Sequence, residues 1–312
     1  MYEEELHRLS VKLLDEVECI IGYASGTLPF RSRPFLCRKK EDVELLTFDH
    51  FSGSNLTRYL LVKDLQKKKV AVLAKGCDAR TITVLLREGQ IKRDNVVVVG
   101  LPCYGMVSLR KLEKRFGPLR PQDFTWHLDT FTFQGKNQSI GPFLEDTCQR
   151  CLYPNPPLFD YLVGPRVEYV PRERWKEDSL KRLEEISPEK RWEFFAQEFQ
   201  RCIRCYACRN ACPLCYCKEC FAEAQRPYWL SPAATRSENL FFHAGRALHM
   251  AGRCVECGAC ERACPLEIPI ALLPLKVVEL IREHFTFEAG VSPDREPPLL
   301  TYRENDPNEF IK

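Results

Sequence analysis

The chain has 312 residues, 45% of them hydrophobic, and a formal net charge of +3, which is enough for about two domains with apolar cores. No apolar run approaches the ~20 residues that cross a bilayer, and the acidic start, MYEEELHRLS, lacks the apolar core of an export signal. Seventeen cysteines would suit a secreted disulfide protein, but their odd number and their clustering at metal-ligand spacing favour a reducing cytoplasm.

The first half of the chain has the pattern of an α/β domain over residues 1–165. Leucines at helical spacing predict a helix over residues 3–16, VECIIGY predicts a buried strand over 17–23, and residues 56–65 predict a second helix. Cys19 lies within the apolar strand and is expected in the core, whereas Cys37 has no assigned role.

A strand–helix–strand unit is the clearest local pattern of this half. The β-rich runs VAVLA (70–74) and VVVV (96–99) flank a helical segment over residues 78–89. Strands joined by a helix with short turns run parallel, with a right-handed crossover. The sequence therefore predicts a sheet that contains parallel strands.

Four cysteines of this domain fall where such sheets bind ligands. Cys77 and Cys103 directly follow the two strands, and open α/β sheets place ligands at the carboxyl ends of their strands. Cys148 and Cys151 form a CxxC pair on a loop downstream. Glycines that allow close backbone approach accompany them: Gly76, Gly100 and Gly105. We interpret the four cysteines as ligands of a [4Fe–4S] cluster; alternatively, Cys77 and Cys103 are small buried hydrophobes and the pair is redox-active or binds zinc.

Residues 166–200 are interpreted as a linker followed by a helix. The stretch 165–187 is charged and irregular. Ser187 and Pro188 give an N-cap and a proline at the first helical position, and the helix is expected to run to about Gln200. Its aromatic residues are expected to pack in a core or an interface: Trp192, Phe194, Phe195 and Phe199.

Two cysteine runs define residues 201–271. Each has the spacing CxxCxxCxxxCP of bacterial ferredoxins, in which the fourth cysteine of each run ligates the other [4Fe–4S] cluster. The runs are Cys202, Cys205, Cys208 and Cys212, and Cys254, Cys257, Cys260 and Cys264. Cluster A is therefore assigned to Cys202, Cys205, Cys208 and Cys264, and cluster B to Cys254, Cys257, Cys260 and Cys212. Together with the first domain, this predicts an α/β domain followed by a two-cluster ferredoxin-like domain with an insertion and flanking helices.

Zinc is the structural alternative, but zinc sites use two CxxC pairs or Cys/His mixtures, a less specific pattern than the doubled run. A [4Fe–4S]²⁺ core with four thiolates carries about −2. Two clusters would change the net charge from +3 to about −1, and a third would change it to about −3. Since no dense Lys/Arg stripe with interleaved aromatics is present either, nucleic acid is not an expected partner.

The gap from Cys212 to Cys254 is longer than in a minimal ferredoxin. It contains further cysteines, which are candidates for additional ligands or for thiols shielded by burial: Cys215, Cys217 and Cys220. His243 and His249 lie six residues apart, do not share a helix face, and are interpreted as ordinary residues.

Residues 272–312 follow the ferredoxin-like segment. A last helix is predicted over residues 272–285, and the proline-rich tail from Pro293 to Lys312 has the composition of an arm that lies on a partner.

Three segments of the first domain carry a family resemblance. GCDARTITVLLREG, VVVVGLPCYGMV and CQRCLYPNPPLFDYLVG resemble the beta subunits of coenzyme F-420 hydrogenases and dehydrogenases, including formate dehydrogenase beta subunits. The resemblance covers about residues 15–165, and here the two-cluster motif follows that domain rather than preceding it. It implies [4Fe–4S] clusters, often FAD, and electron transfer between a catalytic subunit and a flavin-linked acceptor.

The leading hypothesis is a non-catalytic iron–sulfur electron-transfer subunit of a cytoplasmic oxidoreductase complex of the heterodisulfide reductase-like, hydrogenase or formate dehydrogenase kind. Its expected partners are other subunits, including a flavoprotein or a catalytic metallo-subunit. One alternative is an FAD-dependent subunit that reduces a small deazaflavin or nicotinamide cofactor, although the chain has no GxGxxG fingerprint. The other is a non-redox, zinc-binding interaction module.

Overall fold

Two compact units make up the chain, Met1–Trp175 and Lys176–Lys312. The computed structural model describes residues 2–168 and 179–298. Within these two ranges, no helix has both the length and the apolar character needed to cross a membrane. Most of the predicted proline-rich tail lies outside the described residues.

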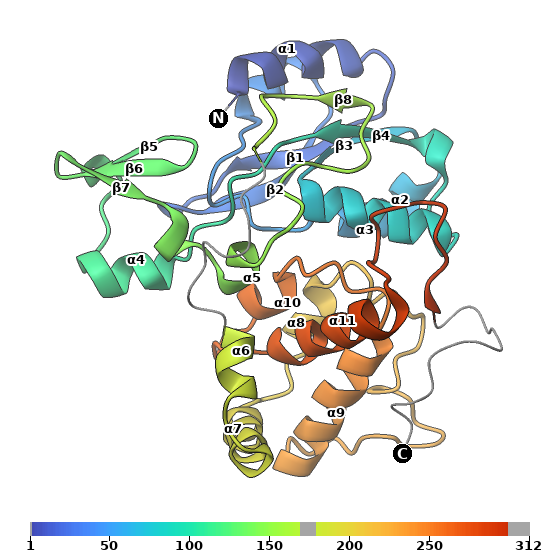
Figure 1. The fold of residues 1–312 in the computed structure, drawn as a ribbon. Coiled ribbons are helices and arrows are strands. Elements are labelled where there is room, and N and C mark those ends of the chain that lie inside the picture. The colour runs from blue at the N-terminus through green and yellow to red at the C-terminus, as the bar shows by residue number, and fades with distance from the viewer. Residues whose placement is uncertain (1, 169–178, 299–312) are drawn as a thin grey trace. The chain divides into compact units, whose positions relative to one another are not determined.

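The first unit contains a five-stranded sheet in the order β2-β1-β3-β4-β8 (Figure 1). Its strands are β1 (Ile20–Ser25), β2 (Ser32–Cys37), β3 (Val70–Ala74), β4 (Val96–Gly100) and β8 (Tyr161–Leu162). The strands β1, β3, β4 and β8 run parallel, and β2 pairs antiparallel with β1 at one edge. The prediction of an α/β fold with parallel strands is confirmed.

Helices lie on both faces of this sheet, with α1 on one side and α2 and α3 on the other (Figure 1). The α-helices are α1 (Glu3–Leu13), α2 (Lys63–Gln66), α3 (Gly76–Arg87), α4 (Leu109–Phe116) and α5 (Asp146–Gln149). Short 3₁₀ helices connect them: η1 (Lys40–Leu45), η2 (Leu56–Leu61), η3 (Arg93–Asn95), η4 (Pro121–Asp123) and η5 (Gly141–Phe143). All five residues of β3 are buried, as expected for a parallel strand covered on both faces.

The strand–helix–strand prediction agrees with the observed β3, α3 and β4 to within two residues at each helix end and one at the strand ends. The strand predicted over 17–23 begins later, at Ile20, and Cys19 just before it is fully buried, as expected. The helix predicted over 56–65 is wrong as a single element. It is divided into η2 and α2 because Val62 between them is extended, with φ −71° and ψ 126°.

A second sheet in this unit was not foreseen from the sequence. It is antiparallel, with the order β5-β6-β7, and consists of β5 (Phe124–Trp126), β6 (Thr130–Phe133) and β7 (Lys136–Ser139). Aromatic rings pack between it and α4, among them Phe116, Phe124, Trp126, Phe131 and Phe133. These strands are too short for their alternation to give a clear signal in the sequence.

The described part of the second unit, residues 179–298, consists of helices joined by loops and contains no strand (Figure 1). Its helices are α6 (Ser179–Glu184), α7 (Pro188–Gln200), α8 (Ala207–Ala211), α9 (Arg236–His249), α10 (Ala259–Arg262) and α11 (Leu272–Phe285). The predicted helices over 188–200 and 272–285 are confirmed, and the Ser187 hydroxyl accepts the N-cap hydrogen bond from Lys190. Four helices were not predicted: α6 within the charged linker, α9 within the insertion between the cysteine runs, and the short α8 and α10 within the runs themselves.

The aromatic residues of α7 only partly follow the packing prediction. Phe199 is 1% exposed, and Phe194 and Phe195 pack against apolar clusters of this unit. Trp192 is 64% exposed, so it does not pack in the core of this unit, and its packing in an interface stays a prediction. It lies on the outer face of the helix, because Phe195 and Phe199 occupy the inner one.

Candidate metal centres

The two cysteine runs fold into loops of the same conformation. In each, the second and the fourth residue after the first cysteine have left-handed backbone, with φ between 49° and 69°. These positions are Arg204 and Tyr206 in the first run and Glu256 and Gly258 in the second. A short helix then carries the third cysteine, α8 in the first run and α10 in the second. Left-handed conformation is costly for residues other than glycine, and such strain clusters at functional sites.

The backbone of each loop donates a hydrogen bond to its first cysteine. The Arg204 N–H lies 3.3 Å from Sγ of Cys202, and the Glu256 N–H bonds in the same way to Cys254. Because N–H groups aimed at sulfur stabilise thiolate ligands, both loops are shaped to hold an anionic sulfur.

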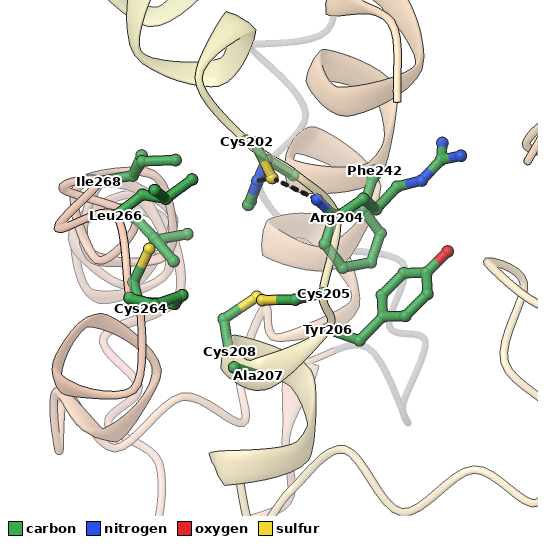
Figure 2. A pocket seen from close by; sticks show the side chains of 13 residues that line it. Cys202, Arg204, Cys205, Tyr206, Ala207, Cys208, Phe242, Cys264, Leu266 and Ile268 are labelled. Atoms are coloured by element: carbon green, nitrogen blue, oxygen red, sulfur yellow. Dashed lines mark hydrogen bonds between the residues drawn. The ribbon is translucent and has the colours of Figure 1, made fainter. Parts of the chain in front are cut away.

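One pocket brings together cysteines from both runs (Figure 2). Cys202, Cys205 and Cys208 line it from the first run, and Cys264 lines it from the second. The side chains of Leu266, Ile268 and Phe242 complete an apolar wall. Figure 2 shows the four sulfur-bearing side chains around the same space. Four thiols in an apolar pocket fit the donor set of a [4Fe–4S] cluster.

The remaining cysteines of the runs form a second, neighbouring set. Burial raises the pKa of Cys260, and nearby Cys212 and Cys257 raise it further. Burial also holds the pKa of Cys254 well above its usual value, with Cys257 and Cys260 adding to the effect. Cys212, from the first run, is therefore close to Cys260 of the second run. Binding of a metal would have to release protons from these thiols.

Of the additional cysteines, the structure brings Cys215 next to this second set. A hydrogen bond with Cys212 lowers the pKa of Cys215 to about 7, the largest of several effects. Cys217 is exposed, and Cys220 is half-buried and interacts with Arg209. Among the described residues, no three His, Cys, Asp or Glu side chains are grouped in a way that fits a single metal ion.

Helix α9 contributes a residue that the sequence analysis dismissed. His243 is 2% exposed, its ring stacks on Phe199 at 4.2 Å between centroids, and its Nε2 lies 3.4 Å from Sγ of Cys202. Burial, followed by the charge of Arg246, lowers the pKa of His243 to about 3, so the ring is neutral. A neutral ring with its proton on Nε2 donates to the Cys202 sulfur. The helical spacing of Asn239, His243 and Arg246 places them on one helix face, but this spacing alone does not distinguish that face from a solvated one.

Three of the four cysteines predicted as ligands in the first unit, Cys103, Cys148 and Cys151, lie close together after the carboxyl end of β4. Burial raises the pKa of Cys103 to about 12, and the thiols of Cys148 and Cys151 add to the rise. The N–H of Gly105, at φ 104°, lies 3.4 Å from Sγ of Cys103, which repeats the turn seen at Cys202. Cys77 lies in the first turn of α3.

A buried ion pair underlies the carboxyl edge of the parallel sheet. Lys75 and Asp78 are 2% and 0% exposed and are 2.7 Å apart, and Lys75 also donates to the Tyr23 hydroxyl. Lys75 is an electrostatic neighbour of both Cys77 and Cys103. The pair ties the start of α3, and with it Cys77, to the sheet. Nothing in the sequence pattern distinguished Lys75 from a surface lysine.

Two glycines allow the loop after Cys151 to lie against the strand ends. A Cβ on Gly76 would lie 1.8 Å from the Tyr153 carbonyl oxygen, and one on Gly100 would lie 2.8 Å from Pro156. Close backbone approach at these two glycines was expected from the sequence, and the contacts are those of the CxxC loop.

Substitution of Gly76 by alanine should therefore displace this loop. We expect the free energy of unfolding to fall by about 3 kcal/mol or more, the upper end of the usual overpacking cost, in chemical denaturation. The control is Gly89→Ala just after α3, where a Cβ meets nothing within 4 Å and only the φ of 64° is unfavourable. This variant should lose about 1–2 kcal/mol of the free energy of unfolding. Equal losses in the two variants would contradict the packing argument.

Comparison with known proteins agrees with these two halves. The family model for the 4Fe-4S dicluster domain matches residues 198–268. The F420-dependent formate dehydrogenase subunit beta of Methanocaldococcus jannaschii is 28% identical over 353 aligned positions, which cover 92% of this chain and 91% of that protein. Subunit beta of F420-dependent formate dehydrogenase 1 from Methanococcus maripaludis is 26% identical, with 92% and 90% covered.

A chain in a solved structure of the F420-reducing [NiFe] hydrogenase complex from Methanosarcina barkeri also matches, with a TM-score of 0.37 and 16% identity. The match covers 47% of this chain and 58% of that one. The two curated relatives extend over nearly the whole chain and confirm the resemblance inferred from the sequence segments. The chain thus has homologues among the beta subunits of F420-dependent formate dehydrogenases and carries a 4Fe-4S dicluster domain in its C-terminal part.

Proposed function

We propose that this chain is the iron–sulfur electron-transfer subunit of a multi-subunit cytoplasmic oxidoreductase of the formate dehydrogenase, hydrogenase or heterodisulfide reductase kind. In this proposal it relays electrons between a flavin or metal centre of a partner subunit and a site on its own α/β unit. The names of the curated relatives, both beta subunits of F420-dependent formate dehydrogenases, support this context.

One observation carries the proposal. Cys202, Cys205 and Cys208 share a pocket with Cys264, which lies more than fifty residues further along the chain. Exchange of the fourth cysteine between two runs is the ligation pattern of two-cluster ferredoxins. A zinc module with two CxxC pairs would not need this exchange.

The protein's own groups have separate tasks in this proposal. Cluster A would be held by Cys202, Cys205, Cys208 and Cys264, and cluster B by Cys254, Cys257, Cys260 and Cys212. A third cluster would be held by Cys77, Cys103, Cys148 and Cys151. Bound [4Fe–4S] clusters supply one-electron carriers. The backbone N–H groups of Arg204, Glu256 and Gly105 orient the thiolates of Cys202, Cys254 and Cys103, respectively. Leu266 and Ile268 keep water from the first pocket.

Iron and acid-labile sulfide analysis of the anaerobically purified full chain tests the proposal. Four irons per cube give about eight Fe and eight sulfides for clusters A and B, and about twelve of each if the third cluster is present. Zinc without sulfide would overturn the redox function and favour the interaction module.

Extraction of flavin from the same preparation tests the second candidate, an FAD-dependent subunit that reduces a deazaflavin or nicotinamide cofactor. The F420-dependence in the relatives' names favours keeping this candidate. About one FAD per chain would support it, and cluster-loaded protein without flavin would support the electron-transfer subunit.

A further inference from the structure

One face of helix α9 carries buried polar residues that lie next to the cysteines of the second unit. Asn239, His243 and Arg246 lie at i, i+4 and i+7 on this helix and are 0%, 2% and 4% exposed. The Asn239 amide donates to the Cys202 carbonyl oxygen at 2.7 Å, which attaches the helix to the first cysteine loop. A helix face of this kind is ordinarily solvated, so its burial requires polar or charged partners.

Arg246 has no anionic partner of the usual kind. Its Nη2 donates to the Cys208 carbonyl oxygen at 3.2 Å, and its Nε has no hydrogen-bond partner in the structure. Its side chain also forms a hydrogen bond with the Cys215 thiol. No carboxylate among the described residues forms an ion pair with it. Two other arginines at the loops differ in this respect, since Arg204 pairs with Glu238, and Arg282 pairs with Glu256.

The electrostatic neighbours of Arg246 are cysteines from both sets, which carry negative charge when they are deprotonated. Burial lowers its pKa, but Cys260, Cys212, Cys208 and Cys215 together raise it above its usual value. Cys208 belongs to the proposed cluster A, and Cys212 and Cys260 belong to cluster B. A guanidinium on a residue that is only 4% exposed, with no carboxylate partner, would be strongly destabilising unless another negative charge offsets it. Two clusters with four thiolates each, about −2 apiece, supply that charge.

We propose that Arg246 is a charge-compensating residue shared by clusters A and B, which raises the reduction potential of both, while His243 raises that of cluster A alone. This inference rests on the proposed function. Reduction adds one negative charge to a cluster, so a fixed cation nearby favours the reduced state of each cluster it faces. With its proton on Nε2, His243 donates to the Cys202 sulfur and acts in the same direction, but this contact reaches only Cys202.

The test is a redox titration of the full chain followed by electron paramagnetic resonance, with each signal assigned by its loss in a ligand variant of cluster A or B. Arg246→Met should lower both midpoint potentials. The expected shift corresponds to about a tenfold decrease in the equilibrium constant for reduction, or 59 mV for a one-electron couple. Arg246→Lys keeps the charge, so the equilibrium constant for reduction of each cluster should stay within about threefold of that in the parent protein. His243→Phe keeps the ring stack and should lower only the cluster A potential, and His243→Gln, which keeps an N–H donor, should restore part of it.

Arg236→Gln is the matched control, because it removes the same charge from an exposed position on the same helix. It should leave both potentials unchanged, since solvent screens an exposed charge. Intact clusters with unchanged potentials in Arg246→Met would overturn this inference alone, whereas a chain without iron and sulfide would overturn the proposed function as well. If Arg246→Met loses iron but Arg246→Lys retains it, the result supports charge compensation. If both variants lose iron, the shape of the arginine side chain is what the clusters need, and the inference is overturned.

Discussion

Replacement of Cys264 by serine is expected to eliminate cluster A and to leave cluster B in place, although Cys264 lies in the second cysteine run. Cys264 shares a pocket with the three cysteines of the first run, whereas Cys212 lies close to Cys260. Loss of one of four thiolates removes or degrades a cube, so about four of the eight irons in the dicluster domain should be lost. Iron and sulfide analysis with electron paramagnetic resonance measures this.

The reciprocal variant makes the test specific. Cys212→Ser should eliminate cluster B, so that its residual spectrum matches that of Cys257→Ser, and the spectrum of Cys264→Ser should match that of Cys205→Ser. Cys19→Ala is the control, because this thiol is fully buried in the other unit and should have no effect on iron content. The opposite pairing of spectra would mean that each run holds its own cluster, contrary to the exchange of the fourth cysteine.

The local part of the fold was predictable because strong patterns carry it. The apolar runs of β3 and β4, the Ser187–Pro188 start of α7 and the bounds of α11 agree closely with the sequence patterns. The sheet β5-β6-β7 escaped prediction because its strands have three or four residues each. The apolar spacing of segment 56–65 continues across Val62 and predicts one helix, but the backbone of Val62 is extended and divides the segment.

In the candidate site, too, some residues were predictable from the sequence and others were not. Cysteine spacing alone predicted which residues belong to each set, since the ligands of a cube repeat at fixed intervals. The supporting residues were not predictable in this way. His243 and Arg246 have the spacing of a solvated helix face, and Lys75 follows a strand as many surface lysines do. Only their burial, at 2%, 4% and 2% exposure, distinguishes them.

Combined replacement of Cys148 and Cys151 by serine is expected to remove about four irons from the first unit and, with them, the relay of electrons to the α/β site. Both thiols are electrostatic neighbours of Cys103 in the structure, and the Cys103 turn has the same N–H···S bond as Cys202. Iron analysis gives the loss. Circular dichroism should show the same secondary structure as in the parent protein, because neither residue belongs to the sheet.

Variants at the strand ends decide between a cluster and an isolated CxxC pair. If four thiolates hold one cube, Cys77→Ser and Cys103→Ser should each lose the same four irons as the double variant, since a cube needs all its ligands. If Cys148 and Cys151 are a redox-active or zinc-binding pair, both strand-end variants should keep their iron. Cys37→Ser is the matched control, because a serine there can still donate to the Lys39 carbonyl oxygen, as the thiol does at 3.4 Å. Unchanged iron in the double variant would contradict the third cluster and would leave the first unit without a metal centre of its own.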